Sequence, residues 1–175
     1  MIDLTNQKIS YIVISSEKID DIMSVLYAKN YQIIPLKGYY QGQYEDSLIA
    51  FGVDNDELRK DLIFLLNHFR VDSGVVKYFG EIDAKKVNKD GSERPLSIVL
   101  YNTDSDNISY LYDGISFSFV EKARYWKPKK EEDFSTGMLV EYMNNNKWYT
   151  KEVVNVSEEY HKLYNKELKE TTSSV

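Results

Sequence analysis

Residues 8–30 read KISYIVISSEKIDDIMSVLYAKN, and this stretch decides how the fold begins. From Lys8 to Ser15 the residues are mainly β-branched or aromatic, which is typical of a short buried strand. A helix is expected to follow to about Asn30, because apolar residues then recur at helical spacing and Ser16 stands at the capping position. A buried strand that leads into an amphipathic helix predicts layers of helix and sheet.

The same alternation of strands and helices continues to about residue 80. Three further strands are expected, at Tyr31–Tyr40, Ser47–Phe51 and Gly74–Phe79. Pro35 indicates an edge position or a bulge in the first of them. Asp54 and Glu57 form a capping-box variant, which predicts a helix over residues 55–70. This order of elements predicts a ferredoxin-like split βαβ arrangement for residues 1–80, with two helices on one face of an antiparallel sheet.

After Gly80 the helical period disappears and the pattern becomes all-β. Hairpin turns are expected at Lys89-Asp90-Gly91, Asp113-Gly114 and Asn144–Asn146. In the strand after the second turn, Phe117 and Phe119 are expected to be buried and Ser116 and Ser118 to face water, because successive side chains point to opposite faces. These strands either extend the first sheet or close a small barrel like that of Tudor-type modules.

A last helix is predicted to begin at Ser157, and the tail that follows it is expected to be loose. The sequence therefore predicts an α+β protein in three parts. These are the split βαβ unit of residues 1–80, an all-β, hairpin-rich part of residues 81–156, and a C-terminal helix with its tail over residues 157–175.

Composition excludes several classes of function. The chain has no cysteine, which excludes disulfides, thiolate zinc sites, iron–sulfur clusters and cysteine nucleophiles. A net charge of −6 disfavours wholesale binding to nucleic acid, since phosphate affinity comes from clustered lysine and arginine. No apolar run is long enough to span a bilayer, and the first residues do not resemble a signal peptide. A cytoplasmic location without a membrane partner is expected.

No motif in the sequence predicts catalysis, a metal site or a cofactor. His68 and His161 stand alone in predicted helices, which favours ordinary helix residues. The stretch from Asp104 to Asn107 begins like a calcium loop but lacks the required glycine and bidentate acid, so a polar turn is the better interpretation.

Fifteen tyrosines in 175 residues favour a protein that binds rather than catalyses, because tyrosine combines a large apolar face with one hydroxyl. Tyr39, Tyr40 and Tyr44 lie in a glycine-bracketed segment that predicts a turn or loop, and they are the first candidate contact surface. The alternative is that two of the three pack on the sheet. Tyr142, Trp148 and Tyr149 form a second aromatic group, for which core packing is favoured over an aromatic cage.

The run KARYWKPKK, residues 122–130, places basic side chains beside aromatic ones. Its candidate nucleic-acid contacts are Arg124, Tyr125, Trp126 and Lys127. Aromatic rings there can stack on bases while the cations meet phosphates. Three acidic residues follow at once and offset that field, so an exposed strand end is favoured over a nucleic-acid site.

Two resemblances add context. The stretches YNTDSDNISYLYDGISFSFVEKARYWKPKK (residues 101–130) and TGMLVEYMNNNKWYTKEVV (residues 136–154) resemble segments of uncharacterised small proteins encoded by tailed bacteriophages. That resemblance implies a viral context. The order of elements in the first half also resembles the nitrogen-regulatory signal proteins, which are trimeric nucleotide binders with a long loop after the second strand; Lys37-Gly38 and the tyrosine-rich segment fall in that region.

We therefore expect a non-enzymatic protein-interaction protein, encoded by a phage, which acts in a virion or on a host protein and needs no cofactor. Two alternatives stay open. One is a regulatory protein that senses a small molecule or nucleotide through residues 38–46. The other is an RNA-binding module that uses the basic and aromatic run. A protein partner is expected in the leading case, and assembly into a homo-oligomer stays open.

Overall fold

The computed structural model describes residues 4–40, 43–101, 109–112, 115–125, 138–144 and 146–153. These residues form a mixed α and β structure of two helices and eleven strands, with most of the regular structure in strands. The predicted helix from Ser157 lies outside the described residues. Neither of the two helices is long and apolar enough to cross a membrane.

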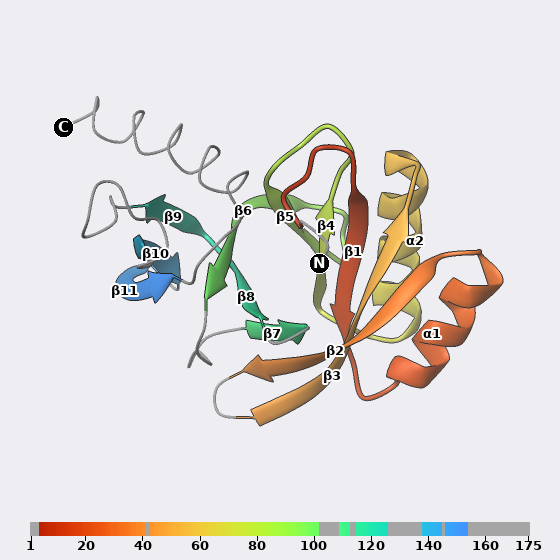
Figure 1. Ribbon diagram of the computed structural model, residues 1–175. Helices are drawn as coiled ribbons and strands as arrows, with labels where there is room; N and C mark the ends of the chain where they lie inside the picture. Colours follow the sequence, from red (N-terminus) through yellow and green to blue (C-terminus); the bar gives the residue numbers. More distant parts are fainter. Residues whose placement is uncertain are drawn as a thin grey trace.

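Eight antiparallel strands form a curled sheet that closes into a barrel in the middle of the molecule (Figure 1). They are β1 (Ser10–Ser15), β2 (Gln32–Tyr40), β3 (Gln43–Gly52), β4 (Ser73–Lys77), β5 (Ala84–Asn88), β6 (Glu93–Tyr101), β7 (Ser109–Tyr112) and β8 (Ile115–Val120). Their order around the barrel is β1-β3-β2-β7-β8-β6-β5-β4. Pairing of Tyr11 with Lys77 and of Val13 with Val75 joins β4 to β1 and completes the ring.

Strand β1 is buried on both faces, as its uninterrupted apolar run predicts. Tyr11 and Val13 belong to the hydrophobic cluster inside the barrel. Ile12 and Ile14 point the other way and pack under the helices, because side chains alternate along a strand. One strand therefore contributes to two hydrophobic cores, which explains why this stretch has no polar face.

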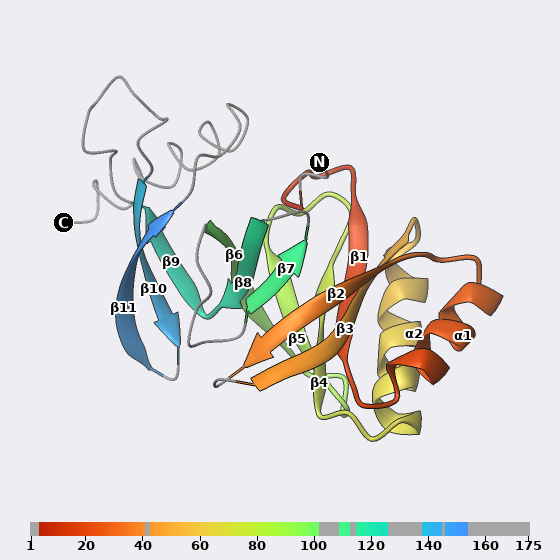
Figure 2. The ribbon, with the colours of Figure 1, turned by 60° about the horizontal axis from the view of Figure 1, so that its bottom comes forward.

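Helices α1 (Ile19–Ala28) and α2 (Asn55–His68) cover the outer face of the barrel at β1, β3, β4 and β5 (Figures 1 and 2). Asp54 caps α2 as predicted, since its carboxylate accepts a hydrogen bond from the backbone N–H of Glu57 at 3.1 Å. The predicted cap at Ser16 is wrong. The Ser16 hydroxyl accepts instead from the backbone N–H of Lys18, which makes a local turn, and α1 begins only at Ile19.

Strands β2 and β3 take up residues 38–40 and 43–46 of the segment that was expected to be a turn or loop, and residues 41 and 42 lie outside the described residues. Backbone pairing of β2 with β3 continues out to Tyr40 and Gln43. Gly38 serves close packing rather than a turn, because a Cβ at this position would lie 2.6 Å from the Ser47 Oγ. The glycine that looked like a loop signal instead leaves room for the Ser47 hydroxyl.

Strands β5 to β8 continue the sheet of β1 to β4. The turn at Asp90-Gly91 is confirmed: the Asp90 carboxylate accepts from the backbone N–H of Ser92 at 2.9 Å, and Gly91 has a φ of 85°. Pairing of Tyr112 with Ile115 joins β7 to β8, while Asp113 and Gly114 lie outside the described residues.

A small second sheet, in the order β11-β10-β9, lies beside the barrel. It comprises β9 (Lys122–Tyr125), β10 (Met138–Asn144) and β11 (Lys147–Val153). Asn146 has a φ of 61° in the β10–β11 turn, as expected for asparagine. The sheet contacts β6 and β8, and Ser118 on β8 is only 2% exposed. The prediction that Ser118 faces water is therefore wrong, because both faces of β8 are covered there.

Candidate functional site

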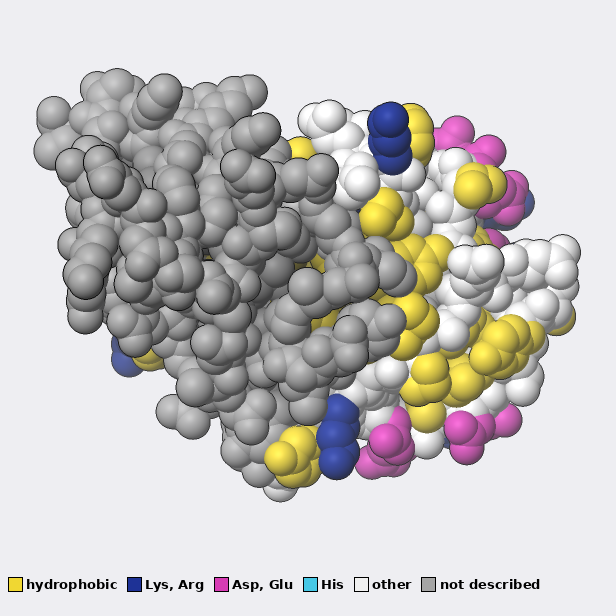
Figure 3. Space-filling view, viewed as in Figure 1, with side chains coloured by type: hydrophobic (Ala, Val, Ile, Leu, Met, Phe, Trp, Pro, Cys, Tyr) yellow, Lys and Arg dark blue, Asp and Glu magenta, His cyan; other side chains and the backbone are white. Residues whose placement is uncertain are grey.

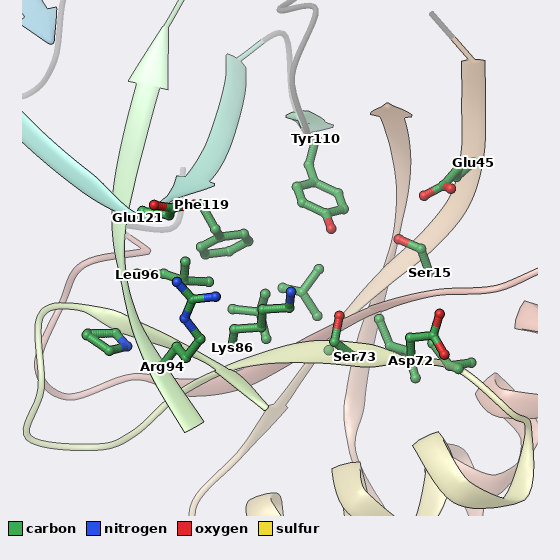
Figure 4. Close-up of a pocket in the computed structure, with 16 residues that line it drawn as sticks. Ser15, Glu45, Asp72, Ser73, Lys86, Arg94, Leu96, Tyr110, Phe119 and Glu121 are labelled. Atoms are coloured by element: carbon green, nitrogen blue, oxygen red, sulfur yellow. The ribbon is translucent and has the colours of Figure 1, made fainter. Parts of the chain in front are cut away.

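A cavity of about 530 Å³ opens at one end of the barrel (Figure 4). Strands β1 and β8 end there, and β3, β4 and β6 begin there. We call this end the barrel mouth and define it by Ser15, Glu45, Ser73, Lys86, Arg94, Tyr110 and Glu121. The cavity volume lies within the range of about 300–1,000 Å³ that is usual for small-molecule sites.

The barrel mouth is built by a change of polarity along the inward-facing positions of the strands. On β1 these positions pass from Tyr11 and Val13 to Ser15. On β6 they pass from Ile98 and Leu96 to Arg94. Inward positions elsewhere follow the same course, from Ile49 to Glu45 on β3, from Val75 to Ser73 on β4, from Ala84 to Lys86 on β5, and from Phe119 to Glu121 at the end of β8. The cavity therefore has an apolar floor and a polar rim.

One wall of the barrel mouth carries two cations. Lys86 on β5 and Arg94 on β6 are directly opposite in the strand register, and both side chains point into the cavity (Figure 4). Lys86 is half-buried and Arg94 is exposed. No ion pair or hydrogen bond joins either side chain to another of the described residues. The two cations are therefore available to an anionic group that enters the cavity.

The opposite wall carries hydroxyl groups and one carboxylate. The Ser15 and Ser47 hydroxyls are hydrogen-bonded to each other at 2.5 Å. Burial raises the pKa of the Tyr110 hydroxyl to about 12; a hydrogen bond with Ser15 opposes this rise, and the negative charge of Glu45 adds to it. Tyr110 consequently stays protonated at neutral pH and offers a neutral hydroxyl at the cavity (Figure 4).

Two further acids line the cavity. Asp72 forms an ion pair with Lys89 at 3.2 Å and is fully exposed at the rim. Glu121 follows β8, and its backbone N–H donates to the carbonyl of Met143 in the second sheet at 3.0 Å. Glu45 and Asp72 therefore stand across the cavity from Lys86 and Arg94, whereas Glu121 lies on the same side as Arg94 (Figure 4).

The histidine among the described residues, His68, lies outside this cavity. The ring of His68 stacks on Phe64, with centroids 5.3 Å apart, and meets the edge of Phe69 at 4.8 Å. No group of three or more His, Cys, Asp or Glu side chains among the described residues could hold a metal ion. His161 and the stretch from Asp104 to Asn107 lie outside the described residues.

The predicted tyrosine surface lies on the β2–β3 hairpin. Tyr44 is 64% exposed, and the Lys37 Nζ lies 4.8 Å from the centre of its ring. Figure 3 shows a hydrophobic side chain against a basic one at the lower edge of the molecule, where this hairpin ends. Tyr39 is paired with Tyr44 and Tyr40 with Gln43 in the strand register. The hairpin carries the three tyrosines in one short segment, and Glu45 beside Tyr44 lines the cavity.

The predicted nucleic-acid run is only partly within the described residues. Arg124 and Tyr125 belong to β9, whereas Trp126 and Lys127 lie outside. In the last hairpin Tyr142 pairs with Tyr149, and the side chains of Trp148 and Tyr149 are each 39% exposed. The use of the basic run in nucleic-acid binding stays a prediction.

Sequence reasoning missed the residues of the barrel mouth. Lys86 and Arg94 stood in strands that were correctly expected to be β, but each looked like an ordinary surface charge. The available signal was the change from apolar to polar at every second residue, as in Ile98, Leu96 and Arg94. That signal becomes readable only when the strand register shows that the polar ends of several strands meet.

Comparison with known proteins adds no relative. The chain matches no model of a known protein family, and no curated protein shows significant similarity to it.

Proposed function

We propose that this chain is a non-enzymatic binding protein whose barrel mouth holds a small molecule. The observation that carries this proposal is the change from apolar to polar on the inward positions of several strands, around a cavity of about 530 Å³. An apolar floor with a few convergent polar groups is the usual composition of a ligand site. The cavity also lies within the barrel, where the hydrogen-bonded strands hold its walls in place.

Binding rather than bond-making is the activity that the described lining supports. Of the two serines in the lining, Ser15 is hydrogen-bonded to Ser47 and Tyr110, not to a base that could activate it. Tyr110 keeps its proton up to a pH of about 12, so it serves as a neutral hydrogen-bonding group. These groups can orient a ligand without reacting with it.

The test is a fragment screen by amide NMR that includes neutral, anionic and cationic compounds. Compounds that enter the barrel mouth are expected to shift the amide signals of Ser73, Lys86 and Leu96. Ser73→Trp should abolish these shifts by filling the cavity, whereas Asp46→Trp, at an exposed position on β3, should leave them unchanged. The proposal is contradicted if no compound of any charge at millimolar concentration shifts the mouth amides of the wild type.

A second candidate function is contact with a protein partner through the β2–β3 hairpin, in the phage context that the sequence resemblance implies. The exposed ring of Tyr44 beneath the Lys37 ammonium favours it, because a rigid aromatic residue gives contact area at low entropic cost. Tyr44→Ser should then reduce capture of the partner from a host lysate at least tenfold. Tyr27→Ser on α1, where the ring is 54% exposed, is the matched control.

We further infer that residues 1–80 form a split βαβ unit. This inference is supported by the spatial order β4-β1-β3-β2 and by the position of both helices against one face of these strands. In that description β5 to β8 are an addition that closes the sheet and creates the barrel mouth.

A further inference from the structure

We infer that the small molecule of the barrel mouth carries an anionic group, a carboxylate or a phosphate, which is held between Lys86 and Arg94. This inference rests on the proposed function and adds the chemical class of the ligand. It comes from the way in which charges are paired on strands β5 and β6 and in the segments beside them.

The other charged residues of strands β5 and β6, Lys85 and Glu93, are paired on the outside of the barrel. Lys85 lies 3.6 Å from Glu81, and Glu93 accepts from Arg59 at 3.1 Å and from the Tyr78 hydroxyl at 2.5 Å. The next lysine along the chain, Lys89, is paired with Asp72. Lys86 and Arg94 differ because they face inward and have no such partner among the described residues.

The unpaired arrangement carries a cost for the folded protein. Two cations directly opposite on one face of neighbouring strands repel each other. An anion between them would convert that repulsion into two attractions. The guanidinium of Arg94 can bind a carboxylate or phosphate with two parallel hydrogen bonds, and the Lys86 ammonium can act as a second point charge.

The rest of the lining defines the body of the ligand. Leu96 and Phe119 lie behind Arg94, and Val75 lies beside Lys86, so an apolar or aromatic body has a floor on which to pack. Tyr110 and Ser15 stand across the cavity as neutral hydrogen-bonding groups. The ligand that matches this arrangement is a small organic anion with an apolar portion.

The experiment compares four probes that share a benzene ring: benzoate, phenyl phosphate, neutral benzamide and cationic benzylamine. Each is titrated into the isotope-labelled protein, and binding is followed by the amide signals around Lys86 and Arg94. Benzoate or phenyl phosphate should bind at least tenfold more tightly than benzamide, and benzylamine should be weakest. The ratio between the two anions identifies the ligand as a carboxylate or a phosphate.

Matched variants locate the effect. Lys86→Gln and Arg94→Gln should each weaken the anionic probe at least fivefold, whereas Lys85→Gln removes the same charge from the outer face of β5 and should change binding less than twofold. The melting temperature checks that each variant folds. It should also rise by about 1–2 °C in Lys86→Gln without a probe, since the repulsion is relieved.

The outcomes separate this inference from the proposed function. Equal binding of benzamide and benzoate, or unchanged anion binding in both Lys86→Gln and Arg94→Gln, would overturn the anionic class and leave small-molecule binding intact. If neither anion shifts a mouth amide while neutral compounds from the fragment screen do, the anionic class is likewise overturned and small-molecule binding is left intact. Failure of all probes and of the whole screen would overturn both proposals.

Discussion

The two ends of the barrel differ in whether the chain itself provides hydrogen-bond partners for an inward-facing lysine. At the closed end, which we define by Tyr11, Lys77 and residues 4–9, Lys77 is fully buried and its ammonium donates to the carbonyls of Asn6 at 2.6 Å and Ile9 at 2.5 Å. At the barrel mouth, Lys86 has no such partner among the described residues. A charge inside a protein is tolerated only when hydrogen bonds replace the lost water, so the chain satisfies one lysine itself and leaves the other for solvent or a ligand.

The difference also shows how the barrel is closed. Residues 4–9 cover the end at which β1 begins (Figure 2), and the Tyr11 hydroxyl donates to the carbonyl of Leu4 at 2.8 Å. The backbone N–H of Gly80 donates to Gln7 at 2.7 Å. The N-terminal segment therefore covers this end of the barrel and is held by polar contacts, whereas the cavity of the barrel mouth opens at the other end.

The largest expected effect comes from removing the lysine of the closed end. Lys77→Ala should destabilise the protein by about 3–5 kcal/mol, because it leaves buried carbonyls without a donor and opens a cavity. Lys86→Ala should change the free energy of unfolding by less than about 1 kcal/mol, because the Lys86 ammonium makes no hydrogen bond to another described residue. Urea unfolding followed by tryptophan fluorescence measures both, and equal losses would break the comparison between the two ends.

Alkaline pH should destabilise the folded protein through ionisation of Tyr110 at the barrel mouth. Its pKa is about 12 in the folded chain against 10.0 for an ordinary tyrosine, so the unfolded chain releases this proton first. Stability from this group is therefore complete below pH 10 and is lost as pH rises from about 10 to 12, by up to about 1.4 kcal/mol per pH unit. When unfolding is measured at a series of pH values, Tyr110→Phe should lose less stability than the wild type as the pH rises. An identical slope in the two proteins would contradict the assignment.

A smaller loss is expected at the closed end when only the hydroxyl of Tyr11 is removed. Tyr11→Phe should cost about 1–2 kcal/mol, because the buried carbonyl of Leu4 loses its donor while the ring and its packing are kept. Amide exchange should accelerate mainly in residues 4–9 if this bond holds the segment down. Faster exchange spread evenly over the barrel would argue against a local effect of this bond.

The smallest effect has the opposite sign. Lys86→Gln or Arg94→Gln should stabilise the protein without ligand by about 0.3–0.5 kcal/mol, since each removes a like charge from a directly opposed pair. The double variant should gain little more than either single variant, because the repulsion is already gone. Chemical unfolding at low salt measures the gain, and destabilisation by both single variants would show that the two cations are satisfied within the chain.

Local features of the fold were predictable because their causes are local. The apolar run from Tyr11 to Ile14 indicated a buried strand, Asp54 indicated the start of α2, and Asp90-Gly91 and Asn146 indicated turns. Each depends on a side chain and the backbone within a few residues of it. The structure confirms all of them.

Errors arose where distant segments decide the outcome. Residues 38–40 and 43–46 looked like parts of a turn or loop, but cross-strand pairing makes them strand, and Gly38 leaves room for the Ser47 hydroxyl. Ser118 looked exposed because its strand alternates, yet a second sheet covers that face. Neither the contact of Gly38 with Ser47 nor the second sheet over Ser118 can be inferred from the residues that are adjacent in sequence.

The candidate site belongs to the same category. Lys86 and Arg94 are eight positions apart and separated by a turn, and Tyr110, Ser15 and Glu45 come from three other strands. No spacing rule connects them. Their meeting depends on the register of β5 with β6 and on closure of the ring between β4 and β1.

The amino-acid sequence alone determined both helices and most strands of the first 80 residues, where several turns fall, and which chemistry is excluded by the lack of cysteine. Those properties follow from steric preference, periodicity and composition, which act over short distances. Tertiary structure alone decided that the sheet closes, that Lys77 is satisfied inside the barrel, and that Lys86 and Arg94 face each other at an open mouth. Strand register sets these relations, because one residue of slip would turn every inward side chain outward.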